Sequence, residues 1–352
     1  MPLGQHLRWR VLASPLVRRG RLPQPIGLLL RSDSANQTYR SARAAYDRRR
    51  RGRVDMVAAD VRFMADLRTR LTPIAFREIL EAAAGWKVAR VPMSPATAID
   101  VVPLLRRNGV GVAVSEHRFV HAKDEGKGGW SNRLARLAHR DENVGDVYVY
   151  VGRDERMMID AAEAESEGDG ALFGEALGIP KCCRDAFDGH LQAVIEHQND
   201  PIIVTILGTL SPPPHRPWNN IASQYFGRCL LSYAPCSLDC RASAELARRT
   251  HALLEQVAPD EASAVLNAQR LAYVFTDRDG VHRLEGSALD GGILRYDGVS
   301  STLDSPLRRR LLAADGLQVS SIGSAKLQFG NGVMERLNEI SRLGIFWGGG
   351  LS

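Results

Sequence analysis

The sequence contains no apolar run long enough to cross a membrane. Its longest candidate, residues 201–210, falls far short of the roughly 18 to 20 residues that a spanning helix needs, so it predicts a buried segment. The motifs Gly-x-Gly-x-x-Gly, Gly-x-x-x-x-Gly-Lys-Ser/Thr and Gly-x-Ser-x-Gly are absent as well, which argues against dinucleotide-binding proteins, P-loop proteins and α/β-hydrolases. We predict a cytoplasmic protein without a membrane partner.

Lysine is scarce, because only five lysines accompany 41 arginines, a usage typical of a GC-rich genome. Thirteen of these arginines lie in residues 1–53, beside two acidic residues. The rest of the chain has 33 basic and 38 acidic residues, although the whole chain carries a net charge of +6. The folded body therefore gives no compositional reason to expect nucleic acid as a partner.

The Arg-rich leader, residues 1–53, is predicted to be disordered, and three interpretations of it stay open. It resembles an organellar transit peptide, an arm that binds nucleic acid or a membrane surface, or upstream sequence that is not part of the native product. We favour the third interpretation, because reading frames upstream of a true start stay open in a GC-rich genome. Met56 would then be the start.

The remaining sequence predicts a mixed α/β (α+β) protein in three parts. Residues 54–165 predict an α/β domain, in which Val110–Val114 and Val147–Val151 are strands of a small mixed or parallel sheet, joined through a helix at residues 132–139. Residues 166–260 predict a helical, cysteine-bearing region packed on that domain. Residues 266–352 predict a small β-rich domain that ends in a helix, Met334–Leu343.

All five cysteines fall within 59 residues, and four of them lie in two compact motifs. Pro180 suits the first turn of a helix, where its missing N–H costs nothing, so Cys182 and Cys183 should lie in that turn. Neighbours on a helix diverge by about 100°, and we expect Cys183 to face the site and Cys182 to face the core. Cys229 is the expected outsider.

The second motif is Pro235-Cys236-Ser237-Leu238-Asp239-Cys240. Here Ser237 is expected to cap a helix that continues through residues 242–253. The two motifs would thus present cysteines at two helix N-termini, where the helix dipole favours the thiolate that binds metal or attacks an electrophile.

Metal or cluster binding is the preferred interpretation of these cysteines. The predicted ligands are Cys182, Cys183, Cys236 and Cys240, and both zinc and an iron–sulfur cluster remain open as the cofactor. The Cys-x-x-x-Cys spacing is not that of a usual zinc knuckle. The alternatives are a disulfide framework, a redox-active dithiol, for example Cys183 with Cys236, and cysteines that merely fill a helical core.

A resemblance supports the grouping of these residues. The string from Phe173 through Gly178-Ile179-Pro180-Lys181-Cys182-Cys183 to Phe187, then Trp218-Asn219-Asn220, then Pro235 through Cys240 to Ser243, resembles a prokaryotic family designated a domain of unknown function. The resemblance covers roughly residues 140–256 and departs at Ile179, where the family often has an aromatic residue. It implies that the four cysteines and Ser243 belong to one feature, and it implies no reaction.

A polar stretch between the two motifs holds the other predicted site residues, Asn219, Asn220 and Gln224. They either hydrogen-bond a small-molecule substrate beside a catalytic Cys183 or lie on a solvated surface as capping residues. Three functions follow: a metal- or iron–sulfur-dependent enzyme that makes or modifies a small molecule, a non-catalytic metal-stabilised accessory or binding protein, or an enzyme with a redox or nucleophilic thiol. The sequence leaves the oligomeric state open.

Overall fold

The computed structural model describes residues 58–120, 136–137, 144–197, 200–211, 215–337 and 343–348, so the predicted Arg-rich leader lies outside the described residues. The described chain has a mixed α/β fold, as predicted, and divides into two compact units. Among the described residues, no helix has the length and apolar character that a membrane span requires.

The first unit comprises residues 58–70, 78–120, 136–137 and 144–179 of the described chain and contains a four-stranded sheet. Its strands lie in the order β1-β4-β2-β3, and each neighbouring pair is antiparallel. The elements are α4 (Ala58–Arg68), the second half of α5 (Pro73–Ala83), β1 (Ala89–Met93), α6 (Pro95–Arg107), β2 (Gly111–Val120), β3 (Arg136–Leu137), β4 (Asp146–Gly152), α7 (Glu155–Glu167) and α8 (Gly170–Ala176).

The sheet of this unit corrects one prediction. Both predicted strands are present, as β2 and β4, but they run antiparallel, with Val112 opposite Val151, rather than in a mixed or parallel sheet. The crossover helix predicted at residues 132–139 is a strand at its centre, Arg136–Leu137; its other residues lie outside the described chain. A parallel arrangement needs a crossover connection, and the described part of this segment continues the sheet instead.

Local sequence signals set the helix ends of this unit. Ser94 caps α6 by accepting a hydrogen bond from the Thr97 N–H at 3.1 Å, and Pro95 occupies the first helical turn. Asp154 caps α7 in the same manner, and the helix ends at Gly168, whose φ of 77° favours glycine. Helix α7 then packs against the sheet through a core of Val88, Tyr148, Tyr150, Met158, Ala161 and Ala176.

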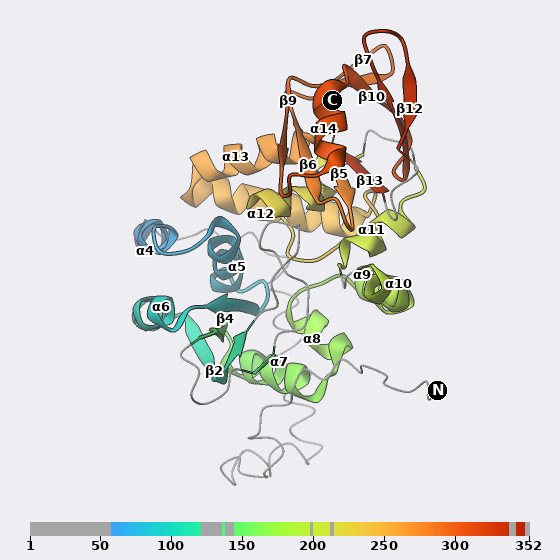
Figure 1. The fold of residues 1–352 in the computed structure, drawn as a ribbon. Helices are drawn as coiled ribbons and strands as arrows, with labels where there is room; N and C mark the ends of the chain where they lie inside the picture. The colour runs from blue at the N-terminus through green and yellow to red at the C-terminus, as the bar shows by residue number, and fades with distance from the viewer. Residues whose placement is uncertain are drawn as a thin grey trace, which may run out of the picture. The chain divides into compact units, whose positions relative to one another are not determined.

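The second unit comprises residues 71–77, 180–197, 200–211, 215–337 and 343–348 of the described chain. Its N-terminal half is helical, and the long helices α12 and α13 lie side by side (Figure 1). The helices are α9 (Lys181–Gly189), α10 (Leu191–Glu196), α11 (Ile202–Gly208), the 3₁₀ turns η1 (Pro217–Asn219) and η2 (Ile221–Phe226), α12 (Arg241–Val257) and α13 (Pro259–Arg270).

The C-terminal half of this unit is β-rich and contains two antiparallel sheets. One has the order β12-β11-β10-β8-β7 and the other β13-β5-β6-β9. Side chains from both sheets and from α14 share one core, which includes Val274, Leu294, Leu307 and Leu327. The elements are β5 (Ala272–Thr276), β6 (Val281–Glu285), β7 (Ala288–Asp290), β8 (Ile293–Arg295), β9 (Gly298–Ser301), α14 (Pro306–Ala313), β10 (Gly316–Ser321), β11 (Ser324–Gln328), β12 (Met334–Arg336) and β13 (Leu343–Trp347).

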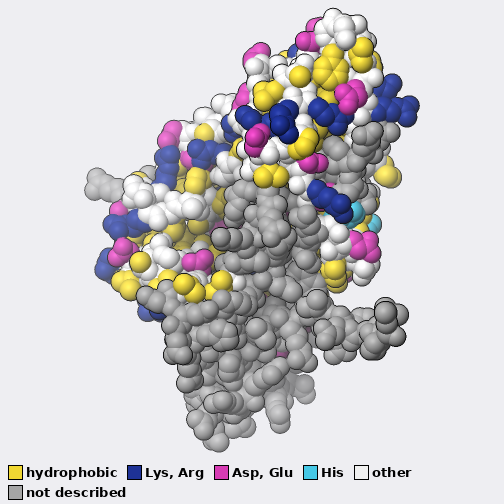
Figure 2. Space-filling model, viewed as in Figure 1, with side chains coloured by type: hydrophobic (Ala, Val, Ile, Leu, Met, Phe, Trp, Pro, Cys, Tyr) yellow, Lys and Arg dark blue, Asp and Glu magenta, His cyan; other side chains and the backbone are white. Residues whose placement is uncertain are grey.

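The predicted C-terminal helix, Met334–Leu343, is wrong where the structure describes it. Met334–Arg336 pairs with β11, and Leu343 begins β13, which pairs with β5. On the visible face of this β-rich half, acidic and basic side chains are interspersed among apolar ones (Figure 2). That face therefore shows no extended surface of one charge.

Candidate metal centre

Helix α9 carries the first cysteine pair at its N-terminus, as predicted. Pro180 is the N-cap, and its carbonyl accepts the Cys183 N–H at 2.9 Å. Cys182 and Cys183 consequently lie in the first turn of α9. Proline favours a helix start here because its φ is fixed and because it disfavours a helical conformation in the residue before it. The proximity of the two cysteines in sequence brings their sulfurs to 3.9 Å from each other.

The second pair lies in a loop, residues 235–240, that leads into α12. The predicted cap, Ser237, is wrong: α12 begins at Arg241 and its N-cap is Cys240. The Ser237 carbonyl accepts the Cys240 N–H at 3.2 Å and closes a turn, so the helix starts three residues later than expected. Cys236 thus lies in the loop, and Cys240 lies at the helix N-terminus.

Helix α11 holds one side of this loop. Thr205 Oγ1 donates to the Pro235 carbonyl at 2.6 Å, and Thr209 Oγ1 accepts the Leu238 N–H at 2.9 Å. Between these two threonines, Gly208 lets the loop backbone approach: a Cβ at Gly208 would lie 1.9 Å from the Cys236 carbonyl oxygen. Ser211 adds a hydrogen bond to the Asp239 carboxylate. These contacts fix the peptide that carries Cys236.

Asn219 holds the loop at its other end. Its Nδ2 donates to the carbonyls of Leu238 and Cys240, at 2.9 Å each, and the residue is fully buried. Because an amide nitrogen carries two donors, both are satisfied by the cysteine loop. The structure therefore gives Asn219 a positioning role toward Cys240; its predicted contact with a substrate stays a prediction.

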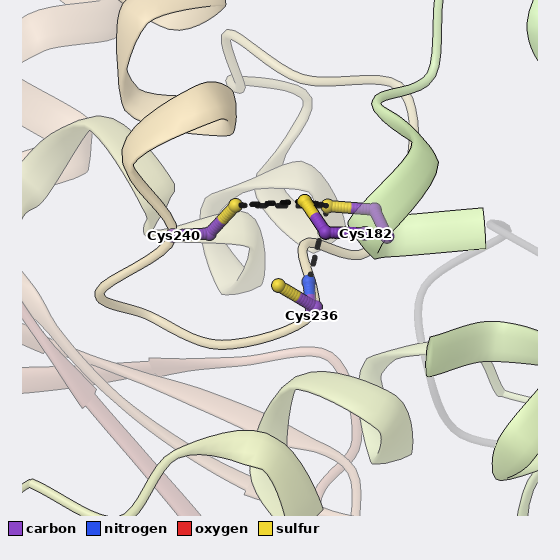
Figure 3. A group of neighbouring side chains, drawn as sticks. Cys182, Cys236 and Cys240 are labelled. Atoms are coloured by element: carbon purple, nitrogen blue, oxygen red, sulfur yellow. Dashed lines mark hydrogen bonds between the residues drawn. The ribbon is translucent and has the colours of Figure 1, made fainter. Parts of the chain in front are cut away.

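The sulfurs of the four predicted cysteines form one compact group, of which Figure 3 labels Cys182, Cys236 and Cys240. The Sγ atoms of Cys182, Cys183 and Cys240 are 3.7 to 3.9 Å apart, and all four sulfurs, with that of Cys236, lie within 4.8 Å of one another. Thiolate–zinc bonds of about 2.3 Å in a tetrahedron separate the sulfurs by about 3.8 Å. These distances exceed the 2.05 Å of a disulfide bond by a wide margin, and the four residues are thiols in this structure. The group could hold a metal ion.

The orientation predicted for the first pair is confirmed for one residue and wrong for the other: Cys183 faces the other cysteines, as predicted, but Cys182 does not face the core. Cys182 is exposed and Cys183 is buried, with 2% of its surface accessible. The pair diverges as expected for helical neighbours, but the loop that carries Cys236 and Cys240 lies over Cys183, so Cys183 is enclosed and Cys182 forms the outer corner. Both sulfurs nevertheless contact Cys240, and both belong to the group.

Polar groups surround the buried sulfur of Cys183. The Cys236 N–H donates to it at 3.3 Å, and Ser243 Oγ lies 3.3 Å away. Tyr233 donates its hydroxyl to Ser243 Oγ at 3.1 Å, which leaves the Ser243 hydroxyl proton to face the sulfur. The structure thus brings Ser243 to the four cysteines, as the resemblance implies.

These contacts shift the thiol pKa values apart. The hydrogen bond with Cys183 holds the pKa of Cys240 well below its usual range, with Ser243 acting in the same direction. The same hydrogen bond, together with burial, raises the pKa of Cys183, and burial with the neighbouring Cys240 raises that of Cys236. Negative charge is therefore favoured on Cys240 over Cys183 and Cys236, so binding a cation would release protons from those two thiols.

Asn220 and Gln224 lie in the same unit but have no hydrogen bond to the cysteine loop among the described residues. Asn220 Nδ2 donates to the carbonyls of Gln269 and Leu271, at 2.9 and 3.0 Å, and so joins the 3₁₀ turns to the end of α13. Both residues are buried, so the predicted solvated surface is wrong. Their predicted roles toward a substrate stay predictions.

Cys229 lies outside the four-cysteine group, as predicted. Its carbonyl accepts a hydrogen bond from Arg77 Nη1 at 3.1 Å. The residues that the sequence reasoning missed are Thr205, Gly208, Thr209 and Tyr233. Two hydroxyls four residues apart, within an otherwise apolar buried segment, were the available signal for Thr205 and Thr209.

Comparison of the chain with known protein families, with curated proteins and with solved structures found no match.

Proposed function

We propose that this protein binds a single zinc ion through Cys182, Cys183, Cys236 and Cys240, and that the ion stabilises the helical half of the second unit. The sulfur spacing carries the proposal. One tetrahedral ion with bonds of about 2.3 Å requires sulfurs about 3.8 Å apart, and three of the pairs lie at 3.7 to 3.9 Å. An iron–sulfur cluster places an iron atom between each thiolate and the centre, so its thiolates lie farther apart.

The donor set supports a structural role over a catalytic one. Structural zinc sites have four protein ligands, whereas catalytic sites keep one position open for water or substrate. Here four cysteine sulfurs lie close together, and Thr205, Thr209 and Asn219 fix the loop that carries two of them. This arrangement favours the metal-stabilised accessory or binding protein among the three predicted functions. The same grouping supports our proposal that the chain belongs with the family that it resembles.

Zinc would connect segments that are distant in sequence. Cys182 and Cys183 begin α9, and Cys240 begins α12. An ion between them ties both helix N-termini and the intervening loop together, and its binding energy becomes folding energy because the unfolded chain has no preformed site. Chelation should therefore destabilise the protein.

Metal analysis of purified protein tests the proposal. We expect about one zinc per chain in the wild type and a colourless solution, as for a four-thiolate zinc site. Cys183→Ala and Cys236→Ala should lose the metal, and Cys182→Ser, at the exposed corner, should lose most of it while retaining native circular dichroism. Cys229→Ala is the matched control, because it removes a buried cysteine outside the group, and it should retain the metal.

Two outcomes would overturn this assignment. Unchanged metal content in both Cys183→Ala and Cys236→Ala would show that these cysteines are not the ligands. Brown protein with iron, sulfide and visible absorption after anaerobic purification would replace zinc with a cluster.

A further inference from the structure

The four sulfurs of the centre differ in their access to solvent. Cys182 is exposed, Cys236 is half-buried, and Cys183 and Cys240 are buried. A reagent that approaches from solvent therefore meets the Cys182 sulfur first. Thiolate reactivity depends on such access as well as on charge.

The sulfurs differ also in their hydrogen bonds. Cys183 receives the Cys236 N–H and faces the Ser243 hydroxyl, both at 3.3 Å. Donors of this kind stabilise negative charge on sulfur and withdraw the electron pair that would attack an electrophile. Among the described residues, the hydrogen-bond partners of Cys182 Sγ are the sulfurs of Cys183 and Cys240, and no N–H or O–H group donates to it. The electron pair of the exposed sulfur is therefore not restrained by such a donor.

Resting on the proposed zinc centre, we propose that Cys182 is its reactive nucleophile toward small carbon electrophiles that bear a leaving group. The Cys182 sulfur forms a bond to the carbon, the bond from that carbon to the leaving group breaks, and the leaving group departs with the electron pair. The product is a thioether at Cys182. The step requires no oxidant, reductant or external base, because the attacking group is already a thiolate.

The charge of the centre supports this assignment. Four thiolates around one divalent cation leave a net charge of −2, which favours electron donation from the outermost sulfur. Alkylation converts one anionic ligand to a neutral thioether. The net charge of the centre then changes from −2 to −1, and the bond between the alkylated sulfur and the ion weakens. The ammonium group of Lys181, which precedes Cys182 in the chain, pairs with Asp185 at 2.6 Å.

Timed alkylation with iodoacetamide tests the proposal on the wild-type protein with its metal bound. Zinc is quantified in each sample before the reagent is added, and labelled cysteines are located by peptide mass mapping. We expect Cys182 to be carbamidomethylated first, at least about tenfold faster than Cys183, Cys240 or Cys229, in keeping with the dependence of thiolate reactivity on access. One iodide should be released for each label.

Two variants serve as controls. Cys182→Ser should lose the fast phase of labelling, and Cys229→Ala should keep it. Labelling of Cys236 or Cys183 before Cys182 in zinc-loaded protein overturns the present proposal and leaves the zinc centre intact. A wild-type protein without metal before labelling overturns the zinc centre, and with it the zinc-bound nucleophile.

Discussion

Replacing Gly208 by alanine tests whether α11 positions the cysteine loop. Gly208 ends α11, and its backbone conformation is not the left-handed one that requires glycine. On helix propensity alone, alanine should therefore stabilise the protein by about 0.5 to 1 kcal/mol. The close contact between Gly208 and the cysteine loop predicts instead that alanine destabilises the protein.

The expected size of the effect follows from the contact distances. The alanine Cβ would lie 1.9 Å from the Cys236 carbonyl oxygen, whereas ordinary contacts begin at 3.4 Å, so the Cys236 peptide must retreat by about 1.5 Å. Metal sites tolerate deviations of about 0.2 Å in ligand distance. The retreat would thus remove Cys236 from the proposed zinc ion or distort α11, and overpacking of this kind costs about 1 to 3 kcal/mol.

Thermal unfolding and zinc retention measure the outcome. A loss of about 1 to 3 kcal/mol in a domain of this size lowers the melting temperature by about 3 to 10 °C, and Gly208→Ala should also release zinc faster to a chelator. Gly189→Ala is the matched control, because Gly189 ends α9 in the same unit and a Cβ there meets nothing within 4 Å. A Gly208→Ala protein as stable as the wild type, with zinc equally retained, would refute the role assigned to α11.

Four further predictions concern the centre and the β-rich half. Asn219→Ala should lower the free energy of unfolding in urea by about 2 to 4 kcal/mol, because the Leu238 and Cys240 carbonyls lose their donor; unchanged stability would favour its predicted role toward a substrate. Thr205→Val, which removes the bond to the Pro235 carbonyl, should cost about 1 to 2 kcal/mol in the same assay. A chelator should lower the melting temperature of the wild type and leave that of Cys236→Ala unchanged. Burial, with the charge of Arg308, lowers the pKa of His282 to about 4. Below pH 6.5 the unfolded chain therefore binds more protons than the folded one, and the free energy of unfolding should fall by up to about 3 kcal/mol between pH 6.5 and 4. His282→Gln should flatten this pH dependence, and an unchanged slope in the variant would contradict the assignment to His282.

The four-cysteine group could be predicted from the sequence because its signals are local. Pro180 fixes a helix start, and cysteines in the turn that follows must lie near the helix N-terminus. The clustering of the five cysteines suggested one centre, and the structure joins four of them and leaves Cys229 aside. Local signals of this kind depend on a few neighbouring residues and need no knowledge of tertiary contacts.

The errors in the predicted fold arise where the secondary structure or the strand direction depends on which strands pair with each other. The segment Met334–Leu343 has a composition that suits a helix, yet its first residues complete a sheet beside β11, and backbone pairing outweighs the small differences in helix propensity. Strand direction in the first unit was missed for a related reason. An apolar run such as Val110–Val114 indicates a buried strand, and it contains no information about whether the neighbouring strand runs parallel.

The exposure of Cys182, which was predicted to face the core, has the most consequence for the proposed function. Helical geometry requires that the side chains of Cys182 and Cys183 diverge, but it does not say which one faces the partner loop. That choice depends on where α11 and Asn219 hold residues 235–240, through contacts between segments about 20 to 30 residues apart. The loop encloses Cys183, and the Cys236 N–H and Ser243 restrain its sulfur. Cys183, which the sequence marked as the nucleophile, is therefore enclosed, and the reactivity that we propose belongs to its neighbour Cys182, which the same loop leaves exposed.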